Sequence, residues 1–165
     1  LGLGYPGGPP VDACARAAAK ASEPFTAPRF RDGKPAWSFS GLKTALKLRV
    51  ERDPRLAAGG KDDPEVQALC RSLQEAVADW LLRPIPEIAR EQGARSLILS
   101  GGVACNSELR LRAAALAARE GLVLAIPEPK LCTDNGAMIA AAGAMLPPDD
   151  GFALNADSDL RLALN

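Results

Sequence analysis

The alternation of short apolar runs with longer helical patterns in the last third of the chain most constrains how it can fold. Ser96–Leu99 and Leu122–Ile126 are short and apolar, which is typical of buried strands. Each run is followed by a stretch of helical composition, over 106–120 and 134–146, and Gly121 is a typical helix stop. This order predicts two parallel strands joined by a right-handed crossover, and therefore an α/β fold.

The preceding part of the chain is dominated by helical patterns. Helices are expected over Val11–Ala21, Gly41–Val50 and Asp63–Trp80, with a loop over 53–63. The third helix has the clearest amphipathic pattern, and Asp63 followed by proline is a typical helix start. Pro84 and Pro86 should interrupt it, and Gly93 should end its continuation.

Composition and charge narrow the class of protein. Apolar residues make up 47% and charged residues 24%, which indicates a globular chain. Twenty basic and twenty acidic residues cancel, so net charge favours neither nucleic acid nor a membrane as partner. The sequence lacks a long apolar run, and its first residues do not resemble a secretory signal. We therefore expect a cytoplasmic protein without a membrane partner.

The four cysteines and the absence of histidine limit metal chemistry. The cysteines form no C-x-x-C pair, and the chain has no histidine. These facts argue against a structural zinc site. Reduced, partly buried thiols are the expected state.

The first candidate site is the junction Ser100-Gly-Gly-Val-Ala-Cys-Asn106, because ligands of open α/β sheets lie at the carboxyl ends of strands. Gly101 and Gly102 allow the backbone to approach a ligand closely, and the next helix offers free N–H groups. The spacing matches neither a P-loop nor a dinucleotide fingerprint. Asn106 either caps that helix or offers its amide to a ribose or a base.

Two further loops carry similar ambiguity. After the second strand, Thr133 or Asp134 could cap the last helix. Asp134 could instead bind a divalent cation, although one carboxylate does not make a metal site. At the start of the chain, Tyr5-Pro-Gly-Gly8 followed by Asp12 suits a nucleotide sugar, with the carboxylate accepting from ribose hydroxyls. A simple connecting turn is the other interpretation.

Basic residues dominate between positions 29 and 55. Lys43 and Lys47 are one helical turn apart and should share a helix face. The cluster is either a patch for a phosphate backbone or an ordinary solvated face, and both interpretations stay open here.

Four stretches together resemble one known family. They are LGLGYPGGPPVD, WSFSGLKTA, LSGGVACNSELR and LCTDNGAMIA. In this order and spacing they resemble the C-terminal part of the TsaD (Gcp) family, the tRNA N6-adenosine threonylcarbamoyltransferases, from residue 1 to about Met145. The resemblance implies one lobe of the two-lobed actin/hexokinase/Hsp70-like (ribonuclease H-like) fold. That lobe would span 1–148, with a helical insertion at about 41–93 and an acidic tail or edge segment over 149–165.

The resemblance also implies an activity and its residues. Family members transfer threonylcarbamoyl from threonylcarbamoyl-AMP to N6 of the adenosine next to the anticodon. Gly8, Asp12 and Asn106 would contact the nucleotide (ATP or threonylcarbamoyl-AMP), Asn106 beside the Gly101–Gly102 turn. Asp134 would ligate one divalent metal, iron or zinc, per full-length subunit. The implied partners are tRNA and TsaB-like and TsaE-like subunits.

Two features of the family pattern are missing from this sequence. The family supplies two metal-binding histidines and a phosphate-contacting glycine segment from an N-terminal lobe, and neither is present here. We therefore expect a single lobe of a longer protein, inactive by itself. One alternative is a diverged, non-catalytic interaction module of the TsaB kind. Another is the older family assignment as a glycoprotein metalloendopeptidase, for which the H-E-x-x-H motif is missing.

Overall fold

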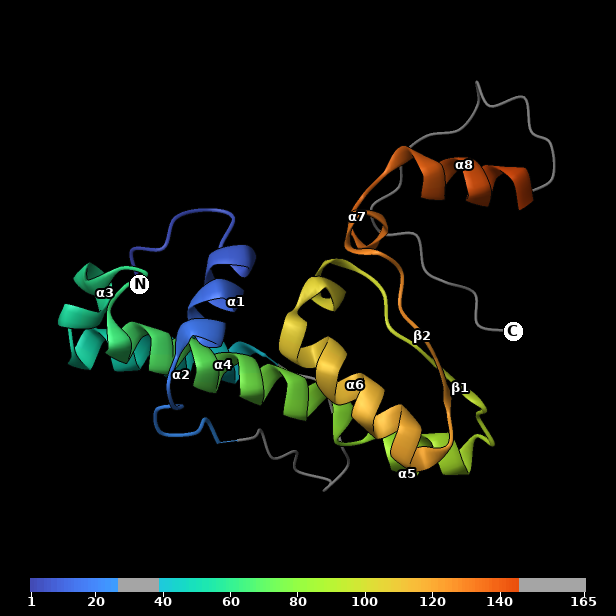
Figure 1. The fold of residues 1–165 in the computed structure, drawn as a ribbon, viewed down its shortest axis with the longest axis horizontal. Coiled ribbons are helices and arrows are strands. Elements are labelled where there is room, and N and C mark those ends of the chain that lie inside the picture. Colours follow the sequence, from blue (N-terminus) through green and yellow to red (C-terminus); the bar gives the residue numbers. More distant parts are fainter. Residues whose placement is uncertain (27–38, 146–165) are drawn as a thin grey trace. The chain divides into compact units, whose positions relative to one another are not determined.

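The computed structural model describes residues 1–26 and 39–145 and divides into two compact units (Figure 1). The first unit covers 1–133, and the described part of the second, 134–145, contains helix α8 (Gly136–Met145). The predicted tail over 149–165 lies outside the described residues. The elements of the first unit are α1 (Gly8–Ala17), α2 (Ser40–Arg52), α3 (Arg55–Gly59), α4 (Pro64–Leu82), α5 (Ile85–Glu91), β1 (Ser96–Ile98), the 3₁₀ helix η1 (Gly102–Cys105), α6 (Ser107–Glu120), β2 (Val123–Ala125) and α7 (Pro129–Cys132).

Helix α4 is the long central element, and α1 and α6 both pack against it (Figure 1). Its start is the predicted one, because Asp63 Oδ1 accepts from the backbone N–H groups of Glu65 at 2.8 Å and Val66 at 3.1 Å. The helix ends before Pro84, so the predicted interruption is confirmed.

Among the described residues of the first unit, three apolar clusters form the core, and α4 contributes to each of them. The first joins α4 to α2, with Leu69 and Trp80 packed among Phe25 and Leu42. The second joins α4 to α1 and contains Cys14, Ala15, Val66 and Cys70. The third joins α4 to α6 and the sheet; it contains Ala78, Leu82, Leu109, Ala113 and Leu116, with Leu97, Leu99 and Leu124 against it. The positions of α1, α6 and the sheet are therefore set by one helix.

The sheet consists of β1 and β2, which pair in parallel with Leu97 opposite Leu124. Parallel pairing was the prediction from the strand–helix–strand order, and it is confirmed. Side chains alternate across the sheet, so Leu97 and Leu124 face the helices while Ile98 and Val123 are 71% and 69% exposed. The chain is thus a mostly helical α/β structure with a small parallel sheet.

The structure contains one helix that was not predicted, and several predicted boundaries shift. Residues 55–59 form helix α3 inside the expected loop, because Pro54 has helical φ and ψ and Asp53 Oδ1 accepts from the backbone N–H of Arg55 at 3.2 Å. Helix α1 begins at Gly8 rather than at Val11 and ends at Ala17 rather than at Ala21. The two intervening prolines fit a first helical turn, where backbone N–H groups have no partner in the helix.

None of the helices within 1–26 and 39–145 is both long and apolar enough to cross a membrane.

The packing of α6 predicts a sharp difference between two of its leucines. Leu109 is fully buried, whereas Leu111, on the same helix, is 67% exposed. We expect Leu109→Ala to lower the free energy of unfolding by about 2–5 kcal/mol and Leu111→Ala to change it by less than about 0.5 kcal/mol. Urea denaturation measures both, and similar midpoints for the two variants would contradict the packing of α6.

Candidate functional site at the junction of α1 and α6

The turn after β1 depends on a glycine and ends in a helix cap. Gly101 has φ +86°, a backbone conformation that glycine adopts without strain. The chain then forms η1 and reaches Asn106, whose Oδ1 accepts from the backbone N–H of Leu109 at 2.9 Å. Asn106 therefore caps α6 through its carbonyl oxygen, which is the first of the two roles that the sequence left open. The amide nitrogen, Nδ2, is a separate donor that this capping bond does not use.

Asp12, on α1, binds directly to the start of α6. Its Oδ1 accepts from the Ser107 backbone N–H at 2.9 Å and from the Ser107 hydroxyl at 2.7 Å. The same oxygen accepts from Gln74 Nε2, on α4, at 2.5 Å, while Oδ2 pairs with Arg16 Nε at 3.2 Å. Elements far apart in sequence thus meet at one carboxylate, and two of the three predicted site segments, the opening loop with α1 and the turn after β1, are brought together.

The surroundings of Asp12 favour its charged form. Partial burial acts to raise the pKa of Asp12, but hydrogen bonds from Ser107 and Gln74 and the charge of Arg16 outweigh burial and hold the pKa below its usual value of 3.8. The carboxylate is therefore ionised at neutral pH, and its side chain is 17% exposed.

This negative charge decides what the junction can bind. The first amides of a helix and its dipole attract anions, and here the carboxylate of Asp12 and the amide oxygen of Asn106 already satisfy two of those amides. A phosphate at the same place would be repelled by Asp12. The junction therefore suits an uncharged, hydroxyl-bearing group such as a sugar better than a phosphate.

Arg110, on α6, ties the ends of the two strands together. Its Nε donates to the carbonyl of Ala104, in η1, at 2.5 Å. Its Nη2 donates to the carbonyl of Pro127 at 2.7 Å and to Cys132 Sγ at 3.3 Å, both in the segment that follows β2. The carboxyl ends of the parallel strands are thus adjacent, as expected for such a sheet.

Sequence reasoning missed Gln74, Ser107 and Arg110. A signal for Gln74 exists, because it occupies a stripe of buried positions spaced four residues apart on α4; the stripe comprises Val66, Cys70, Gln74, Ala78 and Leu82. A polar residue within such a stripe indicates a specific partner. Arg110 carries no comparable signal, since its partners are backbone carbonyls.

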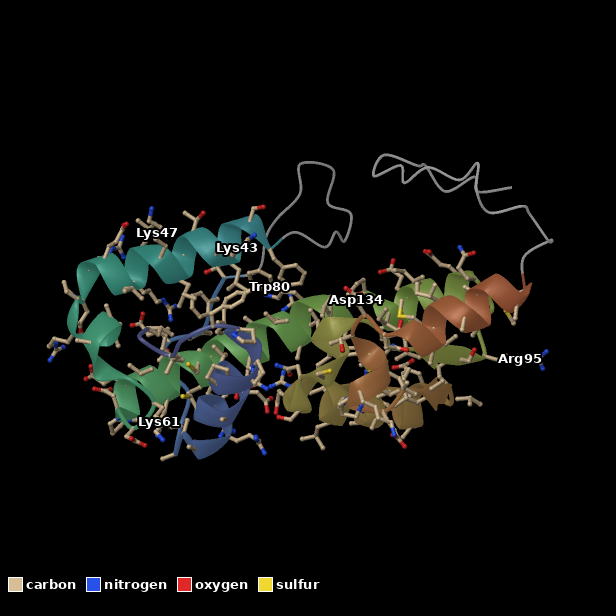
Figure 2. All side chains as sticks on the ribbon, turned by 90° about the horizontal axis from the view of Figure 1, so that it is seen from above. Lys43, Lys47, Lys61, Trp80, Arg95 and Asp134 are labelled. Atoms are coloured by element: carbon tan, nitrogen blue, oxygen red, sulfur yellow. The ribbon has the colours of Figure 1, made fainter. Side chains whose placement is uncertain are left out.

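The remaining predicted residues belong to other segments of the chain. Lys43 and Lys47 are exposed on α2, with Trp80 beneath that helix (Figure 2), and Lys47 pairs with Glu51 at 3.6 Å. Asp134 belongs to the second unit, where its side chain is exposed.

The residue that caps the last helix differs from the prediction. Asn135 Oδ1 accepts from the backbone N–H of Met138 at 2.9 Å, so Asn135, directly before α8, takes the capping position that was expected for Thr133 or Asp134. No three metal-ligating side chains gather within the described ranges, so the residues described here do not complete a metal site.

The thiols differ in accessibility. All four cysteines are free; Cys14, Cys70 and Cys132 are buried and Cys105 is exposed. Burial, with the neighbouring Cys14 thiol, raises the pKa of Cys70 to about 12, so it is a packing residue rather than a nucleophile.

Comparison with known proteins identifies the family of the chain. The family model described as "TsaD: tRNA N6-adenosine threonylcarbamoyltransferase" matches residues 1–141, which is most of the chain. The chain belongs to this family.

Curated relatives named tRNA N6-adenosine threonylcarbamoyltransferase match over most of the chain. The protein of Trichlorobacter lovleyi is 41% identical and that of Geobacter metallireducens 43% identical, each over 143 residues, or 87% of this chain and 41% of the relative. The protein of Corynebacterium aurimucosum is 40% identical over 174 aligned positions, covering 98% of this chain and 48% of the relative. The chain spans less than half the length of these relatives.

The lowered pKa of Asp12 predicts a pH dependence with a defined sign. Because the pKa is lower in the folded than in the unfolded chain, the carboxylate stabilises the fold above the unfolded value and loses this effect as pH falls through the folded value. We expect Asp12→Asn to be less stable than the unaltered chain at pH 7, with the difference shrinking as the pH falls below the ordinary carboxyl pKa of 3.8. Urea denaturation over this range measures it, with the exposed Asp62→Asn as control. A difference that does not change with pH would contradict the assignment.

Proposed function

We propose that this chain is the C-terminal lobe of a tRNA N6-adenosine threonylcarbamoyltransferase and that it holds the adenylate of threonylcarbamoyl-AMP, or ATP, at the junction of α1 and α6. This proposal rests mainly on the hydrogen bonds between Asp12 and Ser107, which join α1 to the start of α6. Family membership supports the activity, and the parallel strands are compatible with an actin/hexokinase/Hsp70-like lobe.

The chemistry of the junction supports a specific orientation of the nucleotide. Gly8 and Asp12 face the ribose, with Asp12 accepting from its hydroxyls. Asn106 donates through Nδ2 to the nucleoside, beside Gly101 and Gly102. The phosphates lie away from Asp12, because that carboxylate already occupies the anion-attracting end of α6. An N-terminal lobe, which the longer relatives have room for, would supply the phosphate contacts and close over the nucleotide.

The reaction proposed for the whole enzyme is an acyl transfer. The N6 amine of the tRNA adenosine attacks the carbamoyl carbon, a C–N bond forms, the bond from that carbon to the phosphate oxygen breaks, and AMP leaves with the proton released to solvent. The residues of this chain position the adenylate for that attack. The lobe is therefore inactive by itself.

Metal binding and subunit assembly are proposals for the whole enzyme. Asp134 contributes one carboxylate to a bound iron or zinc ion, and the other ligands come from outside this chain. TsaB-like and TsaE-like proteins are the proposed partner subunits. No step of the reaction is assigned to the ion, because the described residues do not form a complete site for it.

The two functions of Asn106 can be separated by substitution. Serine is also a good helix cap but has no amide donor, so Asn106→Ser should keep the stability of α6 and lose the bond to the nucleoside. We expect its affinity for AMP to fall by about 2- to 10-fold, the effect of one hydrogen bond. Titration calorimetry measures the affinity, and urea denaturation serves as the control for folding.

An unaltered chain that binds neither AMP nor ATP would overturn the proposed nucleotide site. Equal affinities of the Asn106→Ser and unaltered chains would remove Asn106 from it.

The lysines of α2 are proposed as contacts for the tRNA backbone. Lys43→Glu with Lys47→Glu should weaken tRNA binding and reduce the slope of log affinity against log salt by roughly 1 to 2. The reason is that binding through fewer phosphate contacts releases fewer counterions from the tRNA. Filter binding at several salt concentrations measures the slope. Lys61→Glu with Arg95→Glu changes the net charge equally at exposed positions away from α2 (Figure 2).

An unchanged slope in the Lys43 and Lys47 double variant, or an equal change in the control, would exclude a specific contact at α2.

A further inference from the structure

Gln74 is a polar side chain buried in a stripe of otherwise apolar residues on α4. It is 4% exposed and lies between Cys70 and Ala78 in the stripe of buried residues that are spaced four positions apart on α4. Burying an amide requires compensating hydrogen bonds, otherwise the fold loses stability. The partner here is Asp12 Oδ1, at 2.5 Å.

The bond from Gln74 completes the hydrogen bonding of one carboxylate oxygen. Ser107 already donates to Oδ1 from its N–H and its hydroxyl, so Gln74 brings the number of donors on this oxygen to three. A carboxylate oxygen has about two lone-pair sites, and the three donors share them, so Oδ1 has no capacity for a further donor. A ligand hydroxyl must therefore approach Oδ2, whose partner, Arg16, is 66% exposed.

We propose that Gln74 is a positioning residue for ribose recognition, which holds the Asp12 carboxylate in one orientation so that Oδ2 faces the sugar hydroxyls. This inference rests on the proposed nucleotide site and adds to it a residue that does not itself touch the ligand. Gln74 acts from α4, the helix that fixes α1 and α6, so orientation of the carboxylate is coupled to the core. Without this bond, Ser107 alone holds Oδ1, the carboxylate is less firmly oriented, and its preference for a donor at Oδ2 weakens.

The test compares discrimination between sugars rather than affinity alone. Calorimetry with AMP, 2′-deoxy-AMP and 3′-deoxy-AMP gives the preference for the intact ribose, which we expect to be about 10-fold or more in the unaltered chain for a hydrogen bond to a carboxylate. Gln74→Met has similar volume but no donor, and its preference should fall below about 3-fold. A change in stability alone would weaken binding of all three nucleotides equally.

Ser72→Ala is the matched control. Ser72 is also polar and 3% exposed on α4, but it bonds to Ser22 instead of Asp12. This variant should lose stability and keep the full preference for ribose.

If Gln74→Met does not fold, Ser107 provides a second pair of variants. Ser107→Ala removes the hydroxyl donor to Oδ1 and should reduce the preference, whereas Ser107→Thr keeps a hydroxyl and should retain it.

The outcomes separate this inference from the proposal on which it depends. Failure of the unaltered chain to bind AMP overturns the nucleotide site and the inference together. AMP binding with the same ribose preference in the unaltered and Gln74→Met chains overturns the role of Gln74 and leaves the site in place. Loss of preference in Ser72→Ala as well would show a general effect of helix stability and would also overturn it.

Discussion

The burial of α4 on several sides at once is the constraint on which the rest of the structure depends. Residues of this helix enter all three apolar clusters, so α1, α2, α6 and the sheet are each positioned relative to α4. A small parallel sheet has little stability of its own, and the contacts of Leu97 and Leu124 with this core provide its support. The placement of the two strand ends follows from helix packing as much as from strand pairing.

One charged contact is built into this apolar framework. Asp12 reaches α6 only because α1 and α6 lie against the same helix, and Gln74 from that helix completes its hydrogen bonds. The carboxylate satisfies the helix end that would otherwise attract an anion. An interaction that stabilises the fold therefore also determines the chemical type of ligand that the junction suits.

Sequence patterns predicted local elements well and their assembly less well. The paired strands, the cap at Asp63 and the stop at Gly121, which has a left-handed conformation in the structure, follow from short-range rules. Helix α3 was missed because it is stabilised by bonds between Asp53 and Arg55, which leave no periodic apolar pattern.

In the candidate site, too, some individual residues could be predicted from the sequence, whereas the contacts between them could not. Asp12 and the turn at Gly101–Gly102 were each identified separately, but the bond between Asp12 and Ser107 spans 95 residues and depends on tertiary packing. The family resemblance, now supported by a match over residues 1–141, supplied the link that the patterns alone did not.

The unequal burial of the thiols gives the molecule its own labelling position. Thiol reagents react with the accessible thiolate, so the buried Cys70, with its raised pKa, is protected at neutral pH. Cys105 is exposed and directly precedes Asn106 in the chain. A fluorophore coupled through maleimide chemistry would thus attach next to the α6 cap without any introduced cysteine, where its emission reports changes in the local environment.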